Sequence, residues 1–61
     1  MDNFNKKLSK KIKAMREKLG FSQASLAQAM GLSRVAISQI EQGVRKISAE
    51  EIAKLSVIFN V

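Results

Sequence analysis

Residues 22–42 read SQASLAQAMGLSRVAISQIEQ, and this stretch decides the fold. It contains two short helical patterns, at 23–30 and 34–42, which are joined by a tight turn at 31–33. A serine precedes each pattern, and a serine hydroxyl at that position accepts a hydrogen bond from a free backbone N–H of the first turn. A glycine follows each pattern and favours the left-handed cap that ends a helix. The stretch therefore predicts a helix-turn-helix.

The second pattern, 34–42, has two unlike sides. At about 100° per residue, Ile37 and Ile40 share one face, which is suited to a core. The opposite arc carries polar side chains and one valine, namely Arg34, Val35, Ser38, Gln39 and Gln42. Arg, Ser and Gln side chains can hydrogen-bond base edges in the DNA major groove, where each base pair presents a distinct pattern. This face therefore indicates a helix that reads DNA.

Two further helices are predicted on either side of this stretch. The first covers 5–19 and ends at Gly20, because apolar residues recur there at spacings of three and four. The second covers 49–59 and begins with a capping box, in which Ser48 is the N-cap and Glu51 is the third helical residue. The sequence thus predicts an all-α fold with helices at 5–19, 23–30, 34–42 and 49–59.

Apolar residues on one side of each predicted helix form the expected core. They are Phe4, Leu8, Ile12, Met15, Leu19, Leu26, Ala27, Met30, Ile37, Ile40, Ile52, Leu55 and Phe59, with Leu32 in the turn. A domain of this size buries only about 60% of its unfolded surface. The core is therefore expected to be small.

The chain of 61 residues is basic. It has 11 Lys and Arg against 5 Asp and Glu, a net charge of +6, and most of its basic residues lie before Leu19. Such an excess favours an anionic partner, either nucleic acid or an acidic membrane surface. No apolar run approaches the roughly 20 residues of a bilayer span, and no apolar stretch follows the basic N-terminus as in a secretory signal. We therefore expect a cytoplasmic protein without a membrane segment.

The residue types argue against catalysis. The chain has no cysteine and no histidine, so it lacks the commonest metal ligands and the commonest general base. No nucleophile–base set can be assembled, and the carboxylates show no paired arrangement. We expect no enzymatic activity, no cofactor, no metal site and no small-molecule ligand.

The caps, core pairs and glycines together resemble the Xre/Cro-type repressor family, over roughly residues 8–61. The segments that carry the resemblance are LGFSQ at 19–23, LA at 26–27, MGLS at 30–33 and ISQIEQG at 37–43. The resemblance implies a compact, lambda-repressor-like helix-turn-helix domain over 1–61. Family members usually have five helices, and this chain matches the first four. A fifth helix would follow Val61 and lie outside this sequence.

The resemblance also implies a function, which is sequence-specific binding of double-stranded DNA by a transcriptional repressor. It would act as a homodimer on a palindromic operator, in the cytoplasm of a bacterial cell or a phage-infected host, associated with the nucleoid. The resemblance assigns base contacts to Arg34, Val35, Ser38 and Gln39. An Arg side chain is suited to guanine, a Val side chain to the methyl group of thymine and a Gln side chain to adenine. Alternative readings stay open, since Arg34 and Gln39 would also suit phosphates and Val35 need not touch DNA.

The resemblance also implies which residues contact the DNA backbone and which two residues form an ion pair within the domain. The phosphate-binding positions are Ser22, Gln23, Ser33, Gln42, Arg45 and Lys46, which would position the domain rather than specify sequence. For Gln23, the alternative is an ordinary first-turn polar residue. Arg16 and Glu41 match positions that form a partly buried ion pair, and the alternative is two solvated charges.

The C-terminal residues Val57, Ile58 and Val61 leave apolar surface beyond the expected core. We interpret this set as the dimer interface, in agreement with the family resemblance. A different class of function would use the same surface, because the fold would then be a protein-interaction module such as an antitoxin or adaptor. The polar face of 34–42 favours DNA, since protein interfaces are enriched in aromatics. A membrane-active peptide at 4–19 is disfavoured by the capped, core-forming helices that follow.

Overall fold

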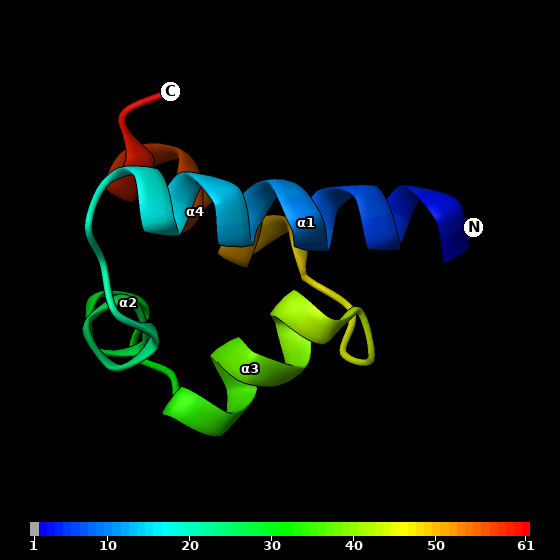
Figure 1. The fold of residues 1–61 in the computed structure, drawn as a ribbon, viewed down its shortest axis with the longest axis horizontal. Coiled ribbons are helices and arrows are strands. Elements are labelled where there is room, and N and C mark those ends of the chain that lie inside the picture. Colours follow the sequence, from blue (N-terminus) through cyan, green and yellow to red (C-terminus); the bar gives the residue numbers. More distant parts are fainter. Residues whose placement is uncertain (1) are drawn as a thin grey trace.

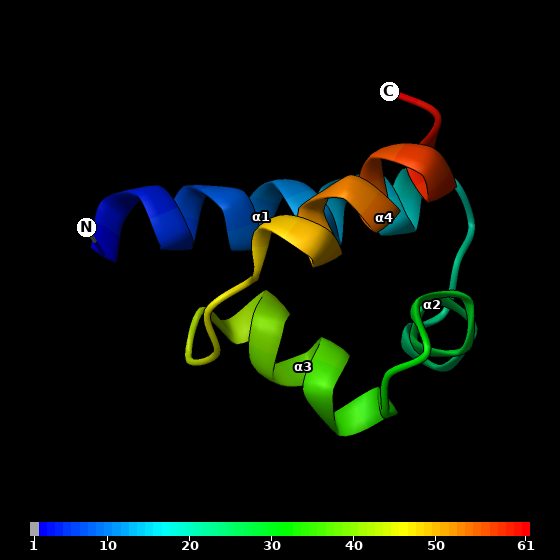
Figure 2. The same cartoon turned by 180° about the vertical axis from the view of Figure 1, so that it is seen from behind.

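Four α-helices make up residues 2–61, the part of the chain that this computed structural model describes. They are α1 (Asp2–Lys18), α2 (Gln23–Met30), α3 (Arg34–Gln42) and α4 (Ala49–Phe59). In Figure 1 and Figure 2, α1 and α4 lie on one side of the molecule, and α2 and α3 lie on the other. Residues 2–61 contain no strand and no helix that is both long and apolar enough to cross a membrane.

The bounds predicted for α2, α3 and α4 are confirmed, and those predicted for α1 are not. The first helix begins at Asp2 rather than residue 5, and it ends at Lys18, one residue early. The apolar repeat that indicated this helix starts only at Phe4, so the pattern held no information about the first turn. The other helices have a cap at each end, and caps are local features of the sequence.

Each of the three later helices starts at a serine whose hydroxyl accepts a backbone hydrogen bond. Ser48 and Glu51 form the predicted capping box, with the Ser48 N–H donating to Glu51 Oε1 at 3.0 Å. Ser22 forms a second box with Ser25, whose hydroxyl accepts the Ser22 N–H at 2.9 Å. Gly43 ends α3 at a φ of 78°, a conformation that strains any residue with a Cβ. The Ser33 and Gly43 caps therefore determine where α3 begins and ends.

The buried core draws on all four helices. It consists of Ile12, Leu26, Ala27, Met30, Ile37, Ile40, Leu55 and Phe59, and Leu32 packs against it. Three residues that the sequence assigned to the core are largely outside it, namely Phe4 at 71%, Leu19 at 46% and Ile52 at 40% exposed. Phe4 lies in the first turn of α1 and Leu19 follows its last residue. In Figure 1 the N-terminal end of α1 extends beyond the other helices. Ile52 instead faces a groove between α1 and α4.

The N-terminal half of α1 packs against the end of α3. Asn5 Nδ2 donates to the Gly43 carbonyl at 3.2 Å, and buried Ser9 lies beside the same glycine. This contact could not be predicted from the sequence, because Asn5 and Ser9 are polar and lie outside the apolar stripe. The contact anchors the C-terminal end of α3, which helps to hold the helix in one orientation.

Candidate nucleic-acid interface

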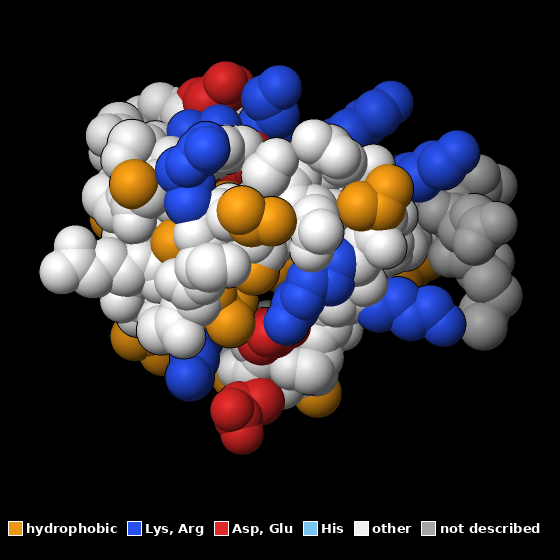
Figure 3. Space-filling model, turned by 90° about the horizontal axis from the view of Figure 1, so that it is seen from below, with side chains coloured by type: hydrophobic (Ala, Val, Ile, Leu, Met, Phe, Trp, Pro, Cys, Tyr) orange, Lys and Arg blue, Asp and Glu red, His pale blue; other side chains and the backbone are white. Residues whose placement is uncertain are grey.

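The two sides of α3 differ sharply in exposure. Ile37 and Ile40 are each 1% exposed, whereas Val35 is 59% exposed on the opposite arc. Arg34, Gln39 and Gln42 are exposed as well, and Ser38 is half-buried. The Ser38 hydroxyl already accepts one hydrogen bond, from Gln42 Nε2 at 3.1 Å. Figure 3 views the molecule from the side of α2 and α3, where backbone and uncharged polar side chains cover much of the surface and basic and hydrophobic side chains lie among them.

Gln23, the first residue of α2, connects α2 to α3. Its Nε2 donates to Glu41 Oε1 at 3.1 Å, and its Oε1 accepts a longer hydrogen bond of 3.4 Å from Arg34 Nη1. Gln23 therefore lies between a residue that holds the domain together and the first residue of the exposed α3 face. At this position its own N–H belongs to the first turn of α2, where the positive end of the helix dipole attracts anions.

Arg16 and Glu41 form an ion pair across α1 and α3. Arg16 Nε donates to Glu41 Oε2 at 2.6 Å, and Nη2 donates to Oε1 at 3.2 Å. The two side chains are only 11% and 3% exposed. The hydrogen bond to Glu41 raises the pKa of the Arg16 guanidinium above its usual range. Arg16 Nη1 also donates to the Phe21 carbonyl at 2.9 Å, so one guanidinium ties α1 to α3 and to the loop before α2.

Arg45 has a partner within the domain. Its Nη1 and Nη2 donate to the two carboxylate oxygens of Glu51 at 3.0 and 2.9 Å. Together with the Ser48 N–H, this arginine lowers the pKa of the Glu51 carboxyl to about 2. Lys46, the next residue, is exposed. A phosphate contact by Arg45 would have to share or replace Glu51, whereas Lys46 is accessible as it stands.

The remaining predicted site residues fall into two groups. Ser22 and Ser33 are exposed N-caps of α2 and α3, so both lie where backbone N–H groups point outward. Val57 and Val61, at and beyond the end of α4, are 81% and 80% exposed. Ile58, predicted to share their surface, is half-buried and packs against the core. The C-terminal surface is thus apolar but smaller than the sequence suggested.

Two interactions of the site were not predicted from the sequence. Glu51 was assigned only to a capping box, yet it also pairs with Arg45, six residues earlier. Gln23 was predicted either to bind a phosphate or to be an ordinary first-turn polar residue, yet its side chain donates to Glu41. Gln23 and Glu41 meet only when α2 packs on α3, so spacing alone carried no signal for their contact. A basic residue shortly before an acidic capping residue was a usable signal for the Arg45 pair.

The comparison with protein families agrees with this geometry. The family described as Helix-turn-helix, whose members are Xre/Cro-like repressors, matches residues 12–61. The match covers most of the chain, which therefore belongs to this helix-turn-helix family. It is an all-α, DNA-binding family that is typically non-enzymatic. No curated protein matches the chain.

Proposed function

We propose that this protein is a sequence-specific transcriptional repressor that binds double-stranded DNA through α3 in the major groove. The observation that carries the proposal is the division of α3. Ile37 and Ile40 fix the helix to the core, while Arg34, Val35 and Gln39 project from the domain with no part in that core. A rigid helix with outward-facing Arg and Gln side chains meets the geometric requirement for base readout.

Base readout and backbone positioning fall to different residues. Arg34 and Gln39 hydrogen-bond bases, Ser38 lies beside them, and Val35 makes apolar contact with a thymine methyl. Phosphates are bound by the first turns of α2 and α3 and by Lys46, with Gln42 and Arg45 near the same strand. The positions are Ser22, Gln23, Ser33, Gln42, Arg45 and Lys46. The net charge of +6 supports this assignment, since phosphate contacts supply most of the non-specific affinity.

The two groups predict different mutant phenotypes on DNA. Arg34→Ala and Gln39→Ala should each reduce discrimination by about 1–3 kcal/mol at one base position. Lys46→Ala should weaken binding to all sequences alike. It should also reduce the slope of log affinity against log salt concentration by about one unit. Gln23→Ala should also weaken binding to all DNA sequences to the same extent. Titrations of each variant against specific and scrambled duplexes, at several salt concentrations, measure both effects. If all four variants lose the same affinity on both duplexes, the base-reading assignment is wrong.

The functional unit is a homodimer on a palindromic operator. A single recognition helix covers only one half-site, and a two-fold pair places two such helices about 34 Å apart on one DNA face. The exposed valines Val57 and Val61, together with Ile58, supply the pairing surface. Because this surface is small, self-association is weak in solution and is strengthened on DNA.

A charge placed in this surface should remove cooperativity. We expect Ile58→Lys to bind a palindromic operator without the cooperative step of the wild type, as measured by sedimentation with and without the operator. Because Ile58 also packs against the core, Val57→Lys is the cleaner variant, since its side chain is 81% exposed. Thermal melting of both variants shows whether the fold is retained. If folded Val57→Lys and Ile58→Lys bind as cooperatively as the wild type, the dimer interface lies elsewhere.

A further inference from the structure

An ion pair joins the segment between α3 and α4 to the first turn of α4. Arg45 Nη1 and Nη2 donate to the two carboxylate oxygens of Glu51 at 3.0 and 2.9 Å. The side chains of Arg45 and Glu51 are 32% and 15% exposed. A pair with two hydrogen bonds and limited exposure holds its geometry better than an ordinary surface pair. Glu51 therefore occupies the charged end of Arg45 in the free protein.

Backbone hydrogen bonds hold both partners of this pair in place. The N–H of Val44, the residue before Arg45, donates to the Gln39 carbonyl at 3.1 Å and so ties the segment to the end of α3. On the other side, the Ser48 N–H donates to Glu51 Oε1 at 3.0 Å, and the Glu51 N–H donates to Ser48 Oγ at 3.1 Å. Arg45 thus meets a carboxylate that is already oriented, which lowers the entropy cost of forming the pair.

The pair changes the charge that this segment brings to DNA. Its basic residues are Arg45 and Lys46. Lys46 is exposed and forms no ion pair with the side chains that the structure describes, which are those of residues 4–61. Arg45 has more N–H donors than this pair uses, so it can still donate to a phosphate oxygen, but together with Glu51 it carries no net charge. The segment therefore presents one effective positive charge rather than two.

We propose that Glu51 limits the DNA affinity of this protein by acting as an intramolecular counterion for Arg45, an inference that rests on the DNA binding proposed above. If a phosphate took Arg45 from Glu51, the carboxylate would be left without a cation beside a strand of like charge. Keeping the pair and breaking it therefore both cancel the gain from Arg45. Phosphate contacts carry no sequence information, so Glu51 weakens binding to all sequences alike.

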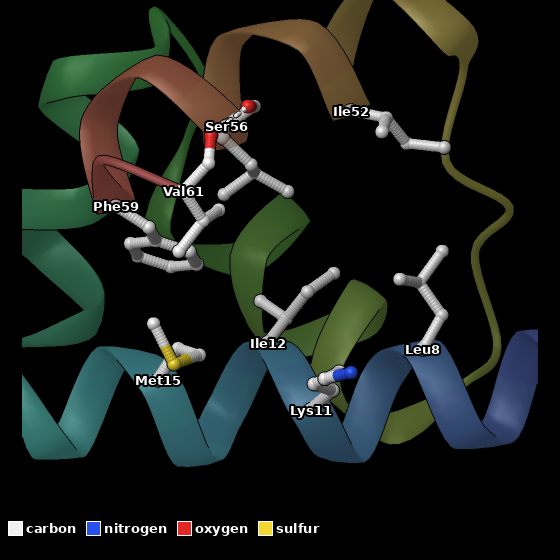
Figure 4. A pocket seen from close by; sticks show the side chains of 9 residues that line it. Leu8, Lys11, Ile12, Met15, Ile52, Ser56, Phe59 and Val61 are labelled. Carbon is white, nitrogen blue, oxygen red and sulfur yellow. Dashed lines mark hydrogen bonds between the residues drawn. The ribbon is translucent and has the colours of Figure 1, made fainter.

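Glu51→Gln tests this role, because it removes the charge and keeps an acceptor for the Ser48 N–H, since Gln also completes a capping box. It leaves the groove between α1 and α4 unchanged, because Ile52 lines that groove and Glu51 does not (Figure 4). We expect tighter binding to a specific and a scrambled duplex alike, by about tenfold at about 50 mM salt and about threefold at about 200 mM. The reason is that each added phosphate contact steepens the slope of log affinity against log salt concentration by about 0.9.

Two further variants identify the cause of this gain. Glu50→Gln is the matched control, because it makes the same charge change in the same first turn of α4, at an exposed residue that forms no ion pair within residues 4–61. It should change affinity by less than about twofold, since an exposed charge beyond the contact is screened by salt. The double variant Arg45→Ala with Glu51→Gln removes both charges of the pair. It should bind within about twofold of the wild type and with the same salt slope.

A wild-type salt slope in Glu51→Gln would overturn the inference. So would an equal gain in Glu50→Gln, or a gain that persists in the double variant, because either result would mean a general effect of net charge. Circular dichroism shows whether each variant is folded. If Glu51→Gln is not, Arg45→Ala decides the question, since it leaves Glu51 unpaired beside DNA and should weaken binding to both duplexes by about threefold or more. Unchanged affinity of Arg45→Ala would then overturn the inference.

The proposed function and this inference fail in different ways. If the wild type binds the specific and the scrambled duplex equally well, the protein is not sequence-specific and the proposed function is wrong. The salt slopes of the wild type and Glu51→Gln still decide the role of Glu51 in that case, because phosphate contacts do not depend on sequence.

Discussion

Replacing Glu41 with alanine should reduce the free energy of unfolding by about 3–5 kcal/mol. It leaves the largely buried Arg16 charge with only the more distant carboxylate of exposed Glu17, at 3.9 Å. The Arg16 side chain is 11% exposed, and its Nε and Nη2 both donate to Glu41. Gln23 loses its acceptor in the same variant. At about 0.05–0.15 kcal/mol per residue, a domain of this length has only about 3–9 kcal/mol to lose. We therefore expect Glu41→Ala to lose a large fraction of the domain's stability.

Urea denaturation monitored by circular dichroism measures this loss, and two further variants identify its cause. Gln23→Ala removes one hydrogen bond and should cost only about 1 kcal/mol. The double variant Arg16→Met with Glu41→Leu replaces the pair by apolar side chains and should recover most of the lost stability. If Glu41→Ala melts like the wild type, the pair is a solvated surface interaction and does not hold α3 against α1.

Replacing Ile37 with alanine should cost about 2–5 kcal/mol, because it leaves a cavity in the core. Ile37 is 1% exposed and belongs to the core cluster that joins all four helices. Val35 lies on the same helix but is 59% exposed, so Val35→Ala should change stability by less than about 0.5 kcal/mol. Comparing Ile37→Ala with Val35→Ala tests whether α3 has one structural side and one DNA-binding side.

Thermal or urea unfolding gives the stability of both variants, and titration against a specific duplex gives their DNA affinity. Ile37→Ala should retain its base preference under conditions where it is folded. Val35→Ala should be as stable as the wild type but should lose discrimination at a position that carries a thymine methyl. Similar stability losses in the two variants would mean that the faces of α3 are not divided as described.

The fold was largely predictable because its signals are local. Ser22, Ser33 and Ser48 each cap the helix that follows, and a hydroxyl and a nearby N–H meet whenever that turn forms. The periodicity of 34–42 likewise separated the buried isoleucines from the exposed residues. The start of α1 was missed because the apolar repeat begins only at Phe4, so nothing in the pattern marks the residues before it.

The exposure of the outer apolar residues was not predictable in this way. Phe4 and Ile52 match the periodicity of core residues, yet whether a residue is covered depends on how far the neighbouring helices extend. Likewise, the Gln23 contact with Glu41 joins residues 18 positions apart, so it follows from the packing of α2 on α3. The groove between α1 and α4 has the same origin.

If α3 reads DNA sequence as half of a dimer, selection from a pool of random duplexes should enrich one particular site. We expect two inverted half-sites whose centres lie about 34 Å apart, one helical turn along the DNA. Repeating the selection with Arg34→Ala should remove the preference for guanine at one position in each half-site and leave the spacing unchanged. If the wild type enriches no sequence, α3 does not read DNA sequence; if Arg34→Ala enriches the same sequence as the wild type, Arg34 does not contact a base.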